Sequence, residues 1–356
     1  MCCCLTVNEV QEKVSKVLLP EVWQWHFDAP INAVLFSDGG SRLALGLGDG
    51  TIRTTAIKAP STDMEAIGVH KGAVLCIREN ADQRCLISGG DDGRLLCTSL
   101  DGGAVREIFA APGLAIDTVA VGGGLTAAAF GRAVGLFDGA GKEVGRAAEH
   151  PSTVTGLAFN SKAKRLGVSH YNGVTLWWTN ALGRSPKHLK WRGSHIAVSW
   201  SPNDNYIMTA TQESELHGWR LSDGADLRMT GYAKKVRSLS WISKGKFLAT
   251  DGSDRVIIWP FAGKGPIGKA PAEIGPAGDI LVRATAAHPA RPLVAAGYDD
   301  GSAFISNIGG LQTLCIKPAD GSRISQLAWS PDGTKIAITN DVREVFLYDL
   351  SRPASA

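Results

Sequence analysis

The stretch ISQLAWSPDGTKIAITNDVREVFLYDL, residues 324–350, predicts three short strands separated by two turns. Its first strand carries apolar Ile324, Leu327 and Trp329. In the following SPDG turn, Pro331 sets φ and Gly333 can adopt a positive φ. The runs KIAIT and EVFLYDL then read as two further strands on either side of a polar turn.

The same pattern recurs along the chain back to residue 31, with a spacing of about 39 to 46 residues. We number these repeat units from first to eighth. Their first strands are expected at 33–36, 74–77, 117–121, 154–159, 196–200, 236–241, 281–287 and 324–329. Three of them end in an aligned tryptophan (Trp200, Trp241 and Trp329), and Phe36 and Phe159 take the same place.

The second strands of the units are short runs of small apolar residues, such as LALGLG and LVAAGY. Asp-Gly or Asn-Gly pairs follow several of them, and such pairs between apolar runs are the strongest local signal for a hairpin. One unit cannot bury both faces of its sheet, whereas units stacked around an axis cover each other. The pattern therefore predicts an all-β propeller of eight four-stranded blades, with seven as the alternative if the short third unit is irregular.

The two ends of the repeat array predict how the ring closes. Only SRPASA follows the last strand, so the eighth unit lacks a fourth strand, and the strand-like run VWQWHF at 22–27 has no unit of its own. We expect that run to pair with EVFLYDL, since closure removes exposed sheet edges. Residues 22–356 then form one propeller domain. Residues 1–21 form a tail with a short amphipathic helix, from the spacing of Val7, Val10, Val14, Val17 and Leu18 before Pro20.

Over roughly residues 22–350 the sequence resembles the WD-repeat (WD40) family of β-propellers. The place of the family's tryptophan is taken by Thr55, Thr98, Phe137, Trp178, Trp219, Trp259, Ser306 and Tyr348. His70 and His150 match the family's buried histidine, and Ser88 and Asp91 match its hydrogen-bonding partners in the second unit. The repeats are degenerate, and the resemblance implies a scaffold for protein–protein interaction.

Composition and motifs narrow the range of functions. The net charge of +3 gives no bulk electrostatic reason to bind nucleic acid or an anionic membrane. No apolar run reaches the roughly 20 residues that span a bilayer, and polar residues interrupt the N-terminal segment, so we expect a cytoplasmic protein. There is no nucleophile elbow, zinc-protease helix, phosphate-binding loop or dinucleotide fingerprint, so we expect no enzymatic activity and no cofactor.

The loops before the first strands and the turns after the second strands should share one face of a propeller. We predict a binding rim there for a protein partner or acidic peptide, because arginine and aromatic residues are enriched at binding hot spots. We expect the chain to be monomeric by itself. An ordinary solvated rim is the alternative. The candidate residues are Lys71, Trp191, Arg192, His195, Lys234, Lys235, Arg237, Arg283 and Arg323, with Asp279 on the same face.

Further alternatives concern other parts of the chain. A ligand-binding or catalytic site in the central channel would draw on Asp117, His195, Arg237 and Arg283. A metal-handling role would use Cys2, Cys3 and Cys4 with rim histidines, for which His26, His170, His195 and His217 are the candidates. The Gly/Pro-rich segment 263–279 is either a poor outer strand, at AEI, with a loop, or a binding loop. Trp177 and Trp178 are both expected to pack between units.

Overall fold

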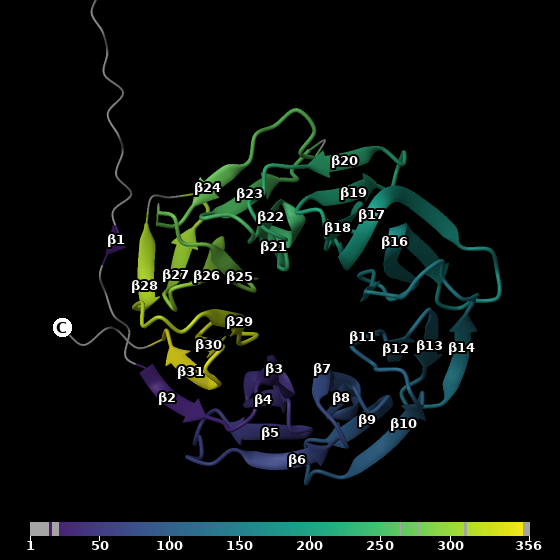
Figure 1. Ribbon diagram of the computed structural model, residues 1–356, viewed down its shortest axis with the longest axis horizontal. Helices are drawn as coiled ribbons and strands as arrows, with labels where there is room; N and C mark the ends of the chain where they lie inside the picture. Colours follow the sequence, from purple (N-terminus) through teal and green to yellow (C-terminus); the bar gives the residue numbers. More distant parts are fainter. Residues whose placement is uncertain (1–13, 16–20, 264, 277, 310–311, 352–356) are drawn as a thin grey trace, which may run out of the picture.

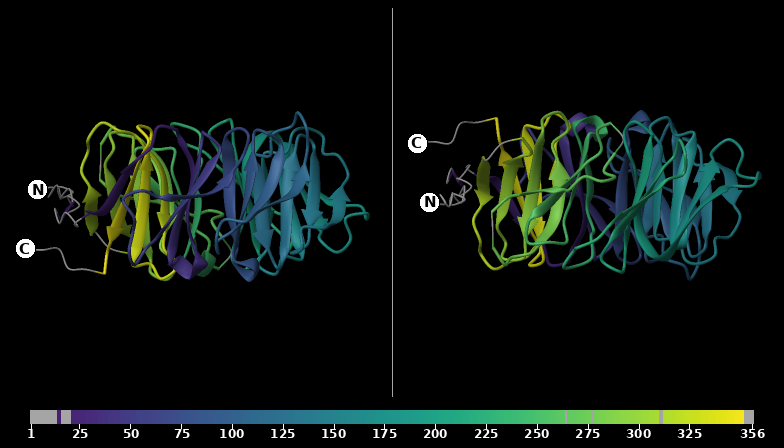
Figure 2. Two further views of the ribbon diagram at one scale, coloured as in Figure 1. Left: turned by 90° about the horizontal axis from the view of Figure 1, so that it is seen from below. Right: turned by 90° about the horizontal axis from the view of Figure 1, so that it is seen from above.

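A computed structural model describes residues 14–15, 21–263, 265–276, 278–309 and 312–351 of the chain. The strands form sheets arranged as a ring around a central opening (Figure 1), and the ring is a flattened disc from the side (Figure 2). The regular helical structure of the described part is limited to three short 3-10 turns, Asp38–Gly40, Ala81–Gln83 and Ser243–Gly245. Within that part, no helix is long and apolar enough to cross a membrane. The chain is a β-propeller, as its turn spacing predicts.

Three of the sheets are consecutive four-stranded meanders. The first contains β3 (Ile31–Ser37), β4 (Arg42–Leu47), β5 (Thr51–Ala56) and β6 (Glu65–Val69). The second contains β7 (Val74–Asn80), β8 (Cys85–Gly90), β9 (Arg94–Ser99) and β10 (Val105–Ala110). The third contains β11 (Thr118–Gly122), β12 (Leu125–Phe130), β13 (Ala133–Phe137) and β14 (Glu143–Ala147). The third unit is therefore regular, although it is the shortest in sequence.

The sixth and seventh units are also meanders. The sixth contains β21 (Leu239–Ile242), β22 (Phe247–Thr250), β23 (Val256–Pro260) and β24 (Ala272–Ile274). The seventh contains β25 (Val282–Ala287), β26 (Leu293–Tyr298), β27 (Ala303–Asn307) and β28 (Thr313–Lys317), with β1 (Val14–Ser15) parallel to β28. Most of the predicted N-terminal helix, like Cys2 to Cys4, falls outside the described residues. Two residues of the predicted helix, Val14 and Ser15, are described, and they are extended rather than helical.

The fourth and fifth units are joined in one six-stranded sheet. It contains β15 (Gly156–Phe159), β16 (Arg165–Trp178), β17 (Lys187–Trp200), β18 (Tyr206–Thr211), β19 (Leu216–Arg220) and β20 (Asp226–Met229). β16 folds back on itself at Asn172 and Gly173, where φ is positive, and the Thr179 N–H donates to the Lys164 carbonyl. The described residues thus form seven hydrogen-bonded sheets. These carry eight repeat units, because the long strands β16 and β17 each serve two strand positions.

The predicted closure strand completes the eighth unit. β2 (Glu21–His26) pairs antiparallel with β31 (Glu344–Asp349), next to β30 (Lys335–Asn340) and β29 (Ile324–Trp329). Trp25 lies opposite Val345 in this pairing and is 4% exposed, within a core shared by the eighth and first units. The closure prediction is confirmed.

The hydrophobic core lies between neighbouring units. The small residues of the second strands pack there, as in β4, where Leu43, Ala44 and Leu45 are fully buried. The aligned tryptophans connect each unit to the one before it. The indole N–H groups of Trp200, Trp241 and Trp329 donate over 3.0 Å to the Ala158 carbonyl, the Ser199 hydroxyl and the Ala286 carbonyl, respectively.

Turns on the far ends of the first strands make a second set of contacts between units. Pro331, in the SPDG turn of the eighth unit, packs against Gly40 of the first unit. A Cβ at Gly40 would lie 2.8 Å from Pro331 Cδ, and its φ of +91° also disfavours other residues. Pro202 packs in the same way against Gly245. The turn sequence therefore fixes the spacing between units as well as the direction of the chain.

Candidate functional site: an arginine-lined cavity on the ring

The main candidate site is a cavity of about 590 Å³ where the first strands of the sixth, seventh, eighth and first units begin. We call it the arginine cavity. It brings together three of the predicted rim residues, Arg237, Arg283 and Arg323. The other polar residues lining it include Asn32, Ser238, Gln326 and Asp341. The Gln326 amide donates to the Asn32 carbonyl over 2.8 Å, which ties the eighth unit to the first at the cavity wall.

Two of the three arginines share one carboxylate. Arg283 donates through Nε and Nη2 to Asp299, with 2.7 Å between Nη2 and Oδ2, and Arg323 Nε lies 2.8 Å from Asp299 Oδ1. Partial burial opposes ionisation of Asp299, but the hydrogen bonds and charges of the two arginines outweigh it and lower the pKa of Asp299. The hydrogen bond with Asp299 in turn raises the pKa of Arg283. These contacts hold both guanidinium groups in place before any partner arrives.

Arg237 is held differently. The backbone N–H groups of Arg237 and Ser238 donate to Asp251 Oδ1 over 2.8 and 3.1 Å, and the Ser238 hydroxyl donates to Oδ2. Asp251 is 1% exposed, and burial raises its pKa to about 6. The side chain of Arg237 is exposed and has no ion-pair partner within the described ranges. The buried aspartate thus fixes the backbone while the guanidinium stays available.

The remaining predicted rim residues do not enter this cavity. Lys71, Arg192, Lys234 and Lys235 are exposed, and the last two lie beside Arg237 in the chain. Trp191 is half-buried and stacks on His217, with 3.9 Å between ring centroids. Its indole nitrogen is buried without a hydrogen-bond partner in the described part of the protein.

The expected rim position of His195 is wrong. His195 is fully buried, with Nδ1 2.8 Å from the Thr209 hydroxyl and Nε2 3.0 Å from the Trp191 carbonyl. His170 and His217 are buried as well, whereas His26 is exposed. The physical reason is that His170, His195 and His217 lie within the strands β16, β17 and β19. Hydrogen bonds and ring contacts with neighbouring side chains hold them in the interior. Among the described residues no three His, Cys, Asp or Glu side chains are placed to hold a metal ion.

The residues suggested for a central-channel site are also separated. Asp117 lines a different cavity, of about 510 Å³, with Asn32, Arg78 and Glu79. Arg237 and Arg283 lie in the arginine cavity, and His195 lies in the interior. The structure therefore does not assemble these four side chains into one catalytic group.

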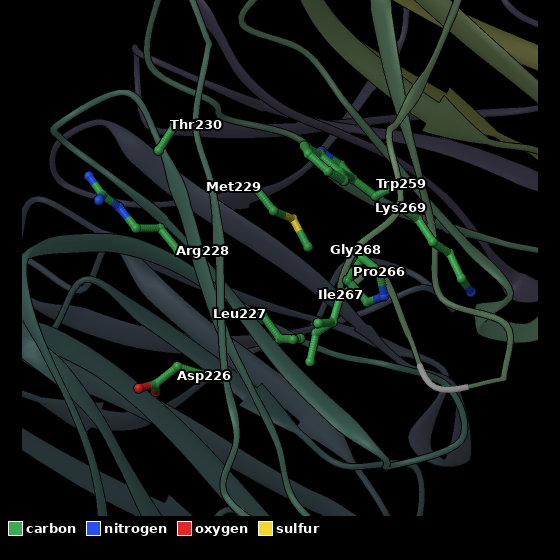
Figure 3. A pocket seen from close by; sticks show the side chains of 10 residues that line it. All are labelled: Asp226, Leu227, Arg228, Met229, Thr230, Trp259, Pro266, Ile267, Gly268 and Lys269. Carbon is green, nitrogen blue, oxygen red and sulfur yellow. The ribbon is translucent and has the colours of Figure 1, made fainter.

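A third cavity, of about 420 Å³, lies between β20 and the Gly/Pro-rich segment (Figure 3). Leu227, Met229, Trp259 and Ile267 contribute its apolar walls. The Trp259 indole donates to the Tyr232 hydroxyl over 2.7 Å. The predicted AEI strand is confirmed as β24, which pairs with β23. Residues 266–269 of the segment form a loop that lines this cavity.

The family's hydrogen-bond network is present in the second unit with one change. His70 Nδ1 lies 2.9 Å from Asp92 Oδ1, and His70 Nε2 lies 2.8 Å from the Ser88 hydroxyl. The acidic partner is Asp92 and not the predicted Asp91, because Asp92 also accepts the backbone N–H groups of Lys71 and Arg94 across the turn. In the family's tryptophan place, the Thr98 hydroxyl is buried and lacks a partner among the described groups.

The fourth unit corrects the prediction for its two tryptophans. Trp177 is buried and donates to His150 Nε2 over 3.0 Å, while His150 Nδ1 donates to the Arg132 carbonyl. Trp178 is 48% exposed and lies over the Arg165 guanidinium. Adjacent residues of a strand point to opposite faces, so only one of the two can occupy the core position.

Comparisons with known proteins agree with this architecture. The family model "WD domain, G-beta repeat" matches residues 64–98, which span the His70 network. The WD repeat-containing protein slp1 of Schizosaccharomyces pombe is 24% identical over 243 residues, which is 66% of this chain and 41% of that protein. The chain thus spans less than half of that relative's length.

Two solved structures share the fold. The computationally designed Ika8 protein superposes with a TM-score of 0.74 at 17% identity, covering 94% of this chain and 99% of Ika8. A chain of the mitotic checkpoint complex superposes with a TM-score of 0.63 at 15% identity, covering 98% of this chain and 99% of that one. The repeat match, the His70 network and the ring of closed units together show a β-propeller whose degenerate repeats resemble those of the WD40 family.

Proposed function

We propose that this propeller is a non-enzymatic interaction scaffold that binds an acidic segment of a protein partner at the arginine cavity. One observation carries the proposal: three guanidinium groups from three consecutive units line one cavity, and Arg237 has no ion-pair partner in the described chain. A guanidinium can bind a carboxylate through two parallel hydrogen bonds, which gives both strength and direction.

The three arginines have different roles in this proposal. Arg237 is the direct anchor for the carboxylate. Arg283 and Arg323 are fixed by Asp299 and keep the cavity open and positive beside it. Lys234 and Lys235 are exposed next to Arg237 and extend the positive surface. Because Asp299 already holds Arg283 and Arg323 in place, these two side chains lose little conformational entropy on binding.

The relatives support a binding role in general terms. WD40 propellers typically bind proteins, and one structural neighbour is part of the mitotic checkpoint complex. The acidic nature of the partner rests on the arginine cavity alone. We further propose that the chain is monomeric by itself and acts in the cytoplasm, on the sequence grounds given above.

A binding titration with a matched pair of probes tests the proposal. A short glutamate-rich peptide and its glutamine counterpart are titrated against the protein by fluorescence anisotropy. We expect the glutamate peptide to bind at least about tenfold more tightly, with an affinity that falls as salt is added. Arg237→Glu should remove this preference. Lys162→Glu, an equal charge change at an exposed turn after β15, should keep it. Equal binding of both peptides, or equal loss in both variants, would contradict the proposal.

A further inference from the structure

Two cysteines of the second unit meet inside the protein, away from the arginine cavity. Cys85 on β8 and Cys97 on β9 are diagonal neighbours, because Cys85 pairs with Ser99 and Cys97 pairs with Ile87. Their Sγ atoms lie 2.7 Å apart, and the side chains are 2% and 7% exposed. Disulfide formation requires two sulfurs that approach each other from suitably spaced strands, and this pair is already in contact.

An arginine distinguishes the two sulfurs. Arg106 on β10 is the direct cross-strand partner of Cys97. The contact with the Cys85 sulfur and the nearby Arg106 guanidinium lower the pKa of Cys97, against the opposing effect of burial. The same thiol–thiol hydrogen bond and burial raise the pKa of Cys85. These opposite pKa shifts favour Cys97 over Cys85 as the sulfur that loses its proton, and the thiolate is the nucleophilic form.

The same core provides an internal comparison. Cys76 belongs to the same hydrophobic cluster as Cys85 and Cys97 and is 6% exposed. Its thiol points to the Ile116 carbonyl, 3.8 Å away, and burial raises its pKa to about 11. Cys76 thus shares the burial of the pair but has neither its thiol contact nor its lowered pKa.

We propose that Cys85 and Cys97 are a site of reversible oxidation, at which hydrogen peroxide closes a disulfide between β8 and β9. The Cys97 thiolate attacks one peroxide oxygen, the O–O bond breaks, and hydroxide leaves and becomes water with the proton that Cys97 lost on ionisation. The Cys85 sulfur then attacks the sulfenic sulfur of Cys97. The S–O bond breaks, and the Cys85 proton leaves with the departing hydroxide as water. Both thiols are oxidised, and the peroxide is reduced to two molecules of water. The low exposure of the pair favours a small oxidant of this kind over a bulky disulfide.

The test follows all three buried thiols in one sample. The full chain carrying Cys2→Ser, Cys3→Ser and Cys4→Ser is exposed to hydrogen peroxide near neutral pH. Free thiols are blocked at successive times, and the peptides are measured by mass spectrometry. We expect a linked Cys85–Cys97 peptide, two hydrogens lighter than the separate thiols, that forms at least about tenfold faster than Cys76 is consumed. Dithiothreitol should reverse the link.

Single substitutions then separate the two roles. Cys85→Ser should leave a sulfenic acid at Cys97 that reacts with dimedone, whereas Cys97→Ser should abolish oxidation at Cys85. Cys76→Ser is the matched control and should keep the linked peptide. Arg106→Met should slow linkage near neutral pH and have little effect at a pH well above the pKa of Cys97.

Two results would overturn the proposal. One is consumption of Cys85 and Cys97 no faster than Cys76. The other is oxidation that yields only links between molecules. Both are read from the chain with its three buried cysteines intact, so neither depends on whether the Cys85 or Cys97 variants fold.

Discussion

Two groups of polar side chains have opposite environments, although the sequence assigns all of them except His150 to a rim. Arg237, Arg283 and Arg323 line an open cavity. The histidine cluster (His150, His170, His195 and His217) is buried in the fourth and fifth units. The arginines follow short loops before first strands, so their side chains reach the face. The histidines lie on or beside the long strands β16 and β17 and point into the interior. The first group is suited to binding, and the second supports the fold.

The largest effect on stability is expected from replacing Trp177, which packs against the histidine cluster at His150. Trp177→Ala removes a buried indole and its hydrogen bond to His150, and should lower the free energy of unfolding by about 3–5 kcal/mol. Trp178→Ala, at the exposed neighbouring position, should cost no more than about 1 kcal/mol. Urea unfolding of both variants measures the difference. Equal losses would show that the two tryptophans are not on opposite faces.

Acid should weaken the histidine cluster next. Burial lowers the pKa of His150 and of His217 to about 4 from 6.5, so the unfolded chain binds more protons. Their contribution to stability is complete above pH 6.5 and is lost as the pH falls toward 4. Asp251 acts in the opposite sense. Burial raises its pKa from 3.8 to about 6, so the folded state takes up its proton first and gains stability over that window.

Because the pKa changes of the two histidines together exceed that of the one aspartate, a net loss on the order of 4 kcal/mol is expected. Urea unfolding as a function of pH measures it, and Asp251→Asn should make the acid loss steeper by removing the compensating group. Unchanged stability down to about pH 4.5 would mean that the buried histidines do not stay neutral.

A substitution in the arginine cavity should affect binding without affecting stability. Arg237→Glu is expected to weaken binding of the glutamate-rich peptide by about tenfold or more, which corresponds to a loss of about 1.4 kcal/mol in binding free energy. Its free energy of unfolding should stay within about 0.5 kcal/mol of the parent, because the side chain is exposed. Anisotropy and urea unfolding on the same samples provide both values. A large stability loss would place Arg237 with the structural group.

The smallest effect is expected at Arg323. Arg323→Ala leaves Asp299 paired with Arg283, so the cavity should keep its shape. We expect the peptide affinity to fall by only about two- to threefold, as is usual for a partly exposed ion pair. The same titration measures this change. A loss as large as that of Arg237→Glu would make Arg323 the anchor instead.

Local patterns were sufficient to predict much of the fold. Some features depend only on residues that are neighbours in the sequence: the SPDG turns, the short apolar second strands and the unpaired run before Ile31. These features predicted the repeat units and the closure by β2. The predictions that failed depend on contacts between strands. A shift of one residue in the alignment puts Trp178 in the core position that Trp177 occupies in the structure, because alternate residues face opposite sides of a strand. A similar shift replaces Asp91 with Asp92 as the partner of His70.

The arginine cavity could be predicted only in part. The face shared by loops before first strands placed Arg237, Arg283 and Arg323 together. The sequence reasoning missed Asp299 as the partner of Arg283 and Arg323, although it lies in a turn after a second strand and therefore on the same face as Arg283. That rule could have identified it. The burial of His195 could not be predicted in this way, since it depends on how β17 continues from one unit into the next.

The central claim is that Arg237 receives an acidic group from a partner. A crystal structure of the protein with the glutamate-rich peptide tests it most directly. We predict a peptide carboxylate in the arginine cavity, at about 2.8 Å from the Arg237 guanidinium nitrogens. The claim would be contradicted if the peptide bound elsewhere and left Arg237 without a contact. The cavity between β20 and the loop containing Ile267 is one such place.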